Sequence, residues 1–284
     1  MRSVVITGAS TGIGLATAKL LIAQGFRVFG SVRKQADAAR VKAELGADFL
    51  PLLFDITGEA AVGAAARQVR AALNGETLFG LVNNAGVALA GPLLELPVDD
   101  FRRQMEINVT GQVIVTQAFA PLLGADTSLA GRRGRIVMIS SVSGKNAWPF
   151  SAPYAASKHA LEGLSESLRR ELMLFGIDVI VIGPGPVKTP IWQKMEGRDI
   201  ERYRNTPYFE VLKRVRAAVE SRGEMGLPPE DVARLVHHAL TTPKPRVRYT
   251  IRPDRMTGFV LSVLPKRWAD RLIARRLGLG RRAS

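Results

Sequence analysis

The chain has 284 residues, of which 46% are hydrophobic and 23% are charged, and these values suffice for one large α/β domain with a buried core. It contains no cysteine, which excludes disulfides and thiolate metal sites and fits a reducing compartment such as the cytoplasm. The formal net charge is +15, and residues 242–284 carry +10 of it, so the basic excess belongs mainly to the C-terminal tail.

Short runs rich in Val, Ile, Leu and Phe alternate with helical patterns along the chain. The apolar runs predict strands covered on both faces, at residues 4–7, 27–31, 49–55, 80–83, 135–140, 178–183 and 248–251. The helical patterns lie at residues 13–24, 35–45, 58–73, 99–122 and 151–175. Such alternation implies right-handed crossovers, so we expect an α/β fold with one doubly wound parallel sheet of about seven strands and helices on both faces.

A glycine-rich segment, Thr7-Gly8-Ala9-Ser10-Thr11-Gly12-Ile13-Gly14, joins the first predicted strand to the first predicted helix. Glycines there allow a tight turn and close approach of a pyrophosphate, and the helix N-terminus presents free N–H groups to phosphate. The motif therefore predicts a nucleotide-binding loop, with a ligand-free glycine turn as the alternative.

Five further motifs follow in order along the chain. They are Asn83-Asn84-Ala85-Gly86, Asn108-Val109-Thr110-Gly111, Ser140-Ser141, Tyr154-x-x-x-Lys158 and Pro184-Gly185-Pro186-Val187-Lys188-Thr189. Together with the Gly-x-x-x-Gly-x-Gly loop they resemble the short-chain dehydrogenase/reductase family over about residues 1–190, although each motif is weak alone. The resemblance implies a single Rossmann-type domain, here over residues 1–255, and an enzyme that interconverts an alcohol and a carbonyl.

Tyr154 and Lys158 lie one helical turn apart and share a helix face. A neighbouring ammonium favours the phenolate, so we expect the pKa of Tyr154 to be lowered toward working pH for general acid/base catalysis. Ser141 can hydrogen-bond the substrate oxygen. The resemblance further implies that Lys158 holds the nicotinamide ribose and that Asn108 supports a water relay. The alternative is that these four residues only pack, cap or face solvent.

The end of the second strand distinguishes NADP from NAD. It reads Ser31-Val32-Arg33-Lys34, without the acid that would bind the ribose hydroxyls of NAD, and Arg33 matches the geometry of a 2′-phosphate. We therefore expect NADP(H), with NAD less favoured. The predicted cofactor-binding residues are Gly8, Ser10, Thr11, Gly12, Ile13, Gly14, Arg33, Asp55, Ile56, Asn83, Ala85, Gly86, Tyr154, Lys158, Pro184, Gly185, Val187 and Thr189.

Residues 187–227 correspond to the substrate-covering region of the family, and their apolar composition suits a lipophilic substrate. Residues 154–176 and the segment around Gly91 resemble hydroxysteroid and retinol dehydrogenases, which suggests a steroid-, retinoid- or lipid-like substrate. The predicted substrate-binding residues are Ser141, Ser143, Trp148, Tyr154 and Trp192. No metal site and no membrane-spanning segment is expected.

Residues 256–284 form a basic extension in which residues 266–277 have an amphipathic helical pattern. We expect this helix to dock on the subunit through Trp268, Leu272, Ile273 and Leu277, and contact with an anionic membrane surface is the alternative. The resemblance implies a homo-oligomer, most simply a dimer, through the helices at 99–122 and 152–175. Two other functions stay open: a catalytically silent NADP(H)-binding regulator and, disfavoured because the charge lies in one tail, a nucleic-acid-binding protein.

Overall fold

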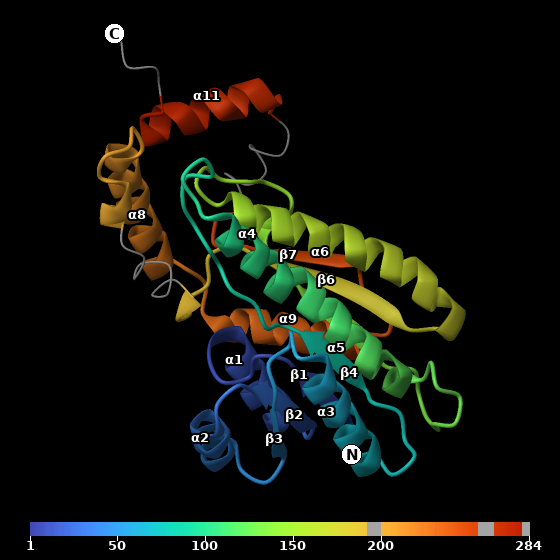
Figure 1. Cartoon of the computed structure of the whole chain (residues 1–284). Helices are drawn as coiled ribbons and strands as arrows, with labels where there is room; N and C mark the ends of the chain where they lie inside the picture. Colours follow the sequence, from blue (N-terminus) through green and yellow to red (C-terminus); the bar gives the residue numbers. More distant parts are fainter. Residues whose placement is uncertain (192–199, 255–263, 280–284) are drawn as a thin grey trace.

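Seven parallel strands form one sheet in the computed structural model, which describes residues 1–191, 200–254 and 264–279 (Figure 1). The strand order is β3-β2-β1-β4-β5-β6-β7, so the predicted doubly wound sheet and its seventh strand are confirmed. Neighbouring strands pair in parallel across the sheet, and no helix of the described residues is long and apolar enough to cross a membrane. The strands are β1 (Ser3–Ile6), β2 (Arg27–Val32), β3 (Phe49–Leu53), β4 (Gly80–Asn83), β5 (Arg135–Ile139), β6 (Asp178–Pro184) and β7 (Arg248–Ile251).

Helices connect the strands and add two elements to those predicted, α8 and α9. The α-helices of the described residues include α1 (Gly12–Ala23), α2 (Gln35–Leu45), α3 (Glu59–Ala72), α4 (Val98–Met105), α5 (Gly111–Phe119), α6 (Ala152–Glu171), α8 (Phe209–Glu224), α9 (Pro229–Thr241) and α11 (Lys266–Leu277). The helix predicted over 99–122 is interrupted, because a π-helical segment, Glu106–Thr110, separates α4 from α5. Gly176 ends the turn after α6 in a left-handed conformation, with φ 67°.

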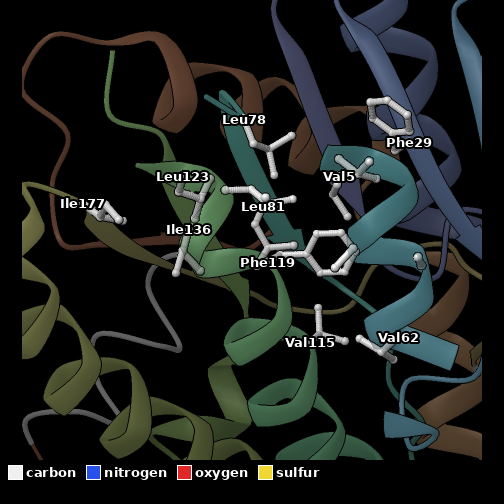
Figure 2. Packing of buried hydrophobic residues seen from close by; sticks show 14 of the residues in the cluster. Val5, Phe29, Val62, Leu78, Leu81, Val115, Phe119, Leu123, Ile136 and Ile177 are labelled. Atoms are coloured by element: carbon white, nitrogen blue, oxygen red, sulfur yellow. The ribbon is translucent and has the colours of Figure 1, made fainter. Parts of the chain in front are cut away.

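Side chains that alternate along each strand form two separate cores, one on each face of the sheet. One core includes Val5 and Phe29 and packs on α3, α5 and α6, as Figure 2 shows for part of it. The other includes Val4 and Val28 and packs on α1, α2 and α9. Because both faces are covered, the carboxyl edge of the sheet is left as the place where side chains meet a ligand.

The C-terminal helix α11 lies beside α8, away from the sheet (Figure 1). Leu277 is buried there, but Trp268 and Leu272 are 62% and 51% exposed. The expectation that these apolar side chains form one docked face is therefore wrong for Trp268 and Leu272. The side of α11 that its neighbours bury is therefore narrower than the apolar face predicted from the sequence.

Two glycines give a matched test of the packing. At Gly30, an added Cβ would lie 2.5 Å from Phe49 Cζ and 2.9 Å from Ala9 Cβ, whereas at Gly163 on α6 it would meet nothing within 4 Å. We expect Gly30→Ala to destabilise the protein by about 1–3 kcal/mol through overpacking. Gly163→Ala should stabilise it by about 0.5–1 kcal/mol, because alanine favours a helix interior. Urea unfolding midpoints measure both changes, and a shift in the same direction for both variants would contradict this packing.

Candidate active site

The glycine turn lies where the strand order reverses, between β1 and β4. Gly8 and Gly12 have positive φ angles of 68° and 57°, and a Cβ at Gly14 would overlap the carbonyl oxygen of Gly8. Only glycine fits these positions, so the turn stays bare at the N-terminus of α1. A phosphate can therefore approach the first amides of that helix.

Side-chain hydrogen bonds hold the loop after β4 against this turn. The Thr7 hydroxyl accepts from the amides of Asn84 and Ala85 at 2.9 and 3.0 Å, and Asn84 Nδ2 donates to the Thr7 carbonyl at 2.8 Å. The Asn83 side chain points elsewhere, because its amide donates to Thr116 Oγ1 inside the core. Any contact of Asn83 with a cofactor would have to come from its main chain.

Ser141, Tyr154 and Lys158 come together beside the carboxyl ends of β5 and β6. Ser141 follows β5, its Oγ accepts from the amide of Ser143 at 3.0 Å, and it is hydrogen-bonded to the Tyr154 side chain. Lys158 Nζ lies 5.8 Å from the centroid of the Tyr154 ring and donates to the carbonyl of Ile139 at 2.8 Å. The structure therefore brings together three of the four predicted catalytic side chains.

The ionisation of this group differs from the prediction made for Tyr154. Burial raises the pKa of the phenol above its usual value, and the hydrogen bond with Ser141 opposes that shift only in part. The expectation that the pKa of Tyr154 is lowered is thus wrong. Burial also lowers the pKa of Lys158 to about 8, against the charge of Glu162. Both shifts favour the neutral forms, since apolar surroundings penalise charge.

Asn108, the fourth predicted catalytic residue, lies in the π-helical segment between α4 and α5. Its Nδ2 donates to the carbonyl of Val87 and to Ser157 Oγ, both at 3.0 Å, and its Oδ1 accepts from the amide of Val87. The side chain therefore ties the loop after β4 to α6. A π-helical turn in mid-helix is often found at functional sites, but the expected water relay stays a prediction.

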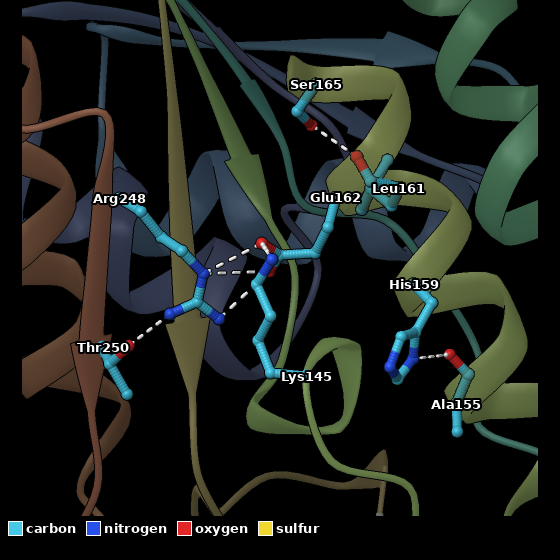
Figure 3. A network of polar contacts seen from close by, with 8 residues as sticks. All are labelled: Lys145, Ala155, His159, Leu161, Glu162, Ser165, Arg248 and Thr250. Carbon is cyan, nitrogen blue, oxygen red and sulfur yellow. Dashed lines mark hydrogen bonds and ion pairs between the residues drawn. The ribbon is translucent and has the colours of Figure 1, made fainter. Parts of the chain in front are cut away.

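A buried acid, Glu162, lies one turn beyond Lys158 on α6 and was missed by the sequence analysis. Arg248 on β7 donates to both of its carboxylate oxygens, at 2.9 to 3.2 Å, and Lys145 Nζ lies 3.4 Å from Oε2 (Figure 3). Although burial opposes ionisation, Arg248, Ser140 and Lys145 together keep the pKa of Glu162 below its usual value. The Tyr-x-x-x-Lys motif continues as Tyr-x-x-x-Lys-x-x-x-Glu, and this spacing is the signal that could have found Glu162.

A hollow of about 480 Å³ opens beside the ends of β2 and β3. It contains the predicted Arg33 and Asp55, whose side chains lie 3.8 Å apart. Burial opposes ionisation of Asp55, but hydrogen bonds from Thr57 and the charges of Arg33 and Arg103 lower its pKa. Ile56 is 5% exposed and would meet a Cβ at Gly111, so its side chain belongs to the core. The lining residues absent from the prediction are Thr57, Arg102, Arg103, Glu106 and Ile107.

The loop before α6 is held in an unusual backbone conformation four residues ahead of Tyr154. Phe150 has a φ of 64°, its carbonyl accepts from the amide of Gly91, and its ring packs edge-on against Tyr208. Such conformations are costly for a residue with a side chain, and they concentrate at functional sites. Ser151, the residue before α6, makes no side-chain cap; its hydroxyl donates to the carbonyl of Trp148.

A short bridge joins the two ends of residues 187–227, the segment expected to cover the substrate. Val187 and Leu227 form an isolated parallel bridge, in which Leu227 N donates to Pro186 O and Lys188 N to Leu227 O, both at 2.9 Å. Thr189, predicted to bind the cofactor, lies against Gly12 of the glycine turn. Trp148 lines a second hollow next to α11, Ser143 is half-buried, and Trp192 lies outside the described residues.

Known protein families, sequences and solved structures resemble this chain. Residues 2–199 match the family model described as short chain dehydrogenase. The chain is 39% identical over 273 residues to an NADPH-dependent 3-dehydrocapnine reductase of Ornithobacterium rhinotracheale, covering 96% of each protein. It is 33% identical to retinol dehydrogenase 5 of Homo sapiens over 95% of this chain and 87% of that protein. A short chain dehydrogenase/reductase structure from Burkholderia phymatum, in complex with NAD, matches at 26% identity with a TM-score of 0.74, covering 87% and 88% of the two chains.

The ionisation of Lys158 can be measured directly by NMR of lysine side chains, with Lys158→Met to assign the signal. We expect a pKa of about 8. Glu162→Gln should lower it by removing a negative neighbour. Arg248→Gln should raise the pKa of Lys158, because the negative charge of Glu162 would lose a positive neighbour. Damage without an electrostatic cause would move both variants in the same direction.

The same titration has a consequence for stability. The folded protein binds the Lys158 proton more weakly than the unfolded chain, whose lysine has its ordinary pKa of 10.5. The free energy of unfolding should therefore rise between about pH 8 and 10.5, and Lys158→Met should remove that rise. An unchanged pH dependence in this variant would contradict the shift.

Proposed function

Because these matches show that the chain belongs to the short chain dehydrogenase family, we propose that it reduces a lipophilic ketone or aldehyde to an alcohol with NADPH, using Tyr154 as the general acid. The observation that carries this proposal is the cluster of Ser141, Tyr154 and Lys158 at the same sheet edge as the glycine turn. The reverse oxidation would use the same groups in the opposite protonation states.

The raised pKa of Tyr154 keeps its phenol protonated, which is the form that reduction needs. A phenol held neutral near pH 7 has a proton to give to the developing alkoxide, and Ser141 can donate a second hydrogen bond to the same oxygen. The bound nicotinamide supplies the hydride. Lys158 keeps its ammonium beside Tyr154 below about pH 8, where it can stabilise the phenolate left after proton transfer.

The residues present fit a dinucleotide phosphate. The bare N-terminus of α1 suits the pyrophosphate, and the hollow with Arg33, Arg102 and Arg103 suits the adenosine end with an additional phosphate. The relative from Ornithobacterium is named NADPH-dependent, whereas the structure from Burkholderia phymatum holds NAD. The preference for NADPH therefore rests on the arginines around this hollow.

The substrate class rests on the covering region and on two relatives. Phe150, Tyr203 and Tyr208 place aromatic side chains near the loop before α6, which suits an apolar molecule. The relatives named above act on 3-dehydrocapnine and retinol by their names. We propose a lipophilic carbonyl substrate, and 3-dehydrocapnine, retinal and steroid ketones form the first panel to assay.

Replacing Tyr154 tests the proposed acid. We expect Tyr154→Phe to lower kcat for NADPH-dependent ketone reduction by roughly 10²–10⁴-fold, with NADPH affinity little changed, because only the proton donor is lost. Tyr249→Phe is the matched control, since that hydroxyl accepts from the amide of Arg246 in the β7 region. Equal turnover in wild type and Tyr154→Phe would contradict Tyr154 as the general acid, and the absence of turnover in both proteins would favour the silent cofactor-binding alternative.

Replacing Arg33 tests the cofactor preference. A hydrogen bond to a charged phosphate contributes about 1.5–3 kcal/mol, so Arg33→Ala should lower the ratio of kcat/KM for NADPH over NADH by roughly tenfold or more. The rate with NADH should change little. Arg170→Ala, which removes an exposed arginine paired with Glu166 on α6, serves as control. An unaltered ratio would exclude Arg33 as the residue that reads the 2′-phosphate.

A further inference from the structure

Helix α11 presents two chemically different faces. Ala269 and Leu277 are buried, and Ile273 and Ala274 are half-buried. This inner face rests on α8, where Arg214 donates to the carbonyl of Leu277 at 3.4 Å. The helix is thereby fixed to the rest of the molecule, and its other face is turned outward.

The outer face combines arginines with apolar side chains and contains no acid. Successive helix residues are rotated by about 100°, so the positions opposite the buried ones lie together on one surface. Its members, all exposed, are Arg267, Trp268, Arg271, Leu272, Arg275 and Arg276. The single acidic residue of the helix, Asp270, lies instead at the hollow between α11 and the Ala147–Pro149 segment.

We propose that this outer face of α11 docks the protein on the surface of an anionic lipid bilayer. Trp268 and Leu272 are large apolar side chains exposed next to one another, an arrangement suited to the boundary between headgroups and acyl chains. Arg271 lies over the Trp268 ring at 5.8 Å, so cation and aromatic group would reach the interface together. The flanking arginines complement anionic headgroups and extend their apolar stems along the bilayer.

The composition of the face favours lipid over two other occupants. Nucleic acid would use the arginines but would leave the exposed Leu272 without a partner. A second copy of this chain would place like charges together across a two-fold interface. Only an anionic bilayer takes up both the four arginines and the two apolar side chains.

The docked orientation has a consequence for the substrate, which rests on the proposed function. The inner side of α11 lines a hollow of about 340 Å³ together with Ala147, Trp148 and Pro149, a few residues before Tyr154. A bilayer on the outer side of α11 would therefore lie one helix thickness from the substrate side of the site. A lipid-like substrate would then have a short path from the membrane.

Vesicle co-sedimentation of the full chain tests the proposal independently of activity. We expect binding to phosphatidylcholine vesicles that contain one-third phosphatidylglycerol, little binding to phosphatidylcholine alone, and release at about 0.5 M NaCl. Arg271→Glu with Arg275→Glu should weaken binding at least roughly tenfold, and Trp268→Ala with Leu272→Ala should weaken it as well.

The matched control is Lys244→Glu with Arg246→Glu, which changes the net charge equally but lies before the amino end of β7, whereas α11 follows the carboxyl end of that strand. It should bind vesicles like wild type, and unchanged NADPH affinity would show that each variant is folded. Equal weakening in this control would reduce the effect to overall charge and overturn the proposal. It would also be overturned if Trp268→Ala with Leu272→Ala only dissociated a dimer in sedimentation, or if the face bound duplex DNA and not vesicles.

Discussion

A buried positive charge is the constraint on which this site depends. Lys158 is 6% exposed, and an ammonium can remain there only if neighbouring groups compensate for its lost hydration. The carbonyl of Ile139 accepts a hydrogen bond from the Lys158 ammonium, and Glu162 supplies a negative charge one turn away. Glu162 is buried in turn and needs Arg248 and Lys145. Charge compensation therefore runs from β5 through α6 to β7, so the last strand of the sheet influences the ionisation of Lys158.

Parallel topology explains why distant motifs meet. The carboxyl ends of parallel strands lie at one edge of a sheet, and those of β1, β4, β5 and β6 carry the glycine turn, the loop of Asn84, Ser141 and Pro184. Direct hydrogen bonds then hold these loops together, such as those from Asn84 and Ala85 to Thr7. The two cores packed on the faces of the sheet hold these strand ends in place.

The parts that the sequence predicted well are local or contiguous. Most strands are apolar runs of four to seven residues, and the glycine turn, the Asn83–Gly86 motif, Ser140-Ser141 and the motif from Pro184 lie at the ends of such runs. What escaped prediction depends on contacts between distant segments: the pair of Arg248 and Glu162, the arginines of α4 beside Arg33, and the direction of the pKa shift at Tyr154. Burial decides the direction of the pKa shift of Tyr154. The sequence shows the neighbouring Lys158, but it does not show that the phenol is shielded from solvent.

The two halves of the site are built with different rigidity. The cofactor side is formed by strand ends joined through ladder and side-chain hydrogen bonds, so its geometry follows from the sheet. The proposed substrate side consists of the described part of residues 187–227, whose ends meet in the bridge between Val187 and Leu227, and of α11, which rests mainly on α8. Loops and outlying helices can change their side chains without disturbing the sheet. Substrate choice and surface contacts can therefore vary on this fold while the cofactor half and its buried lysine stay constant.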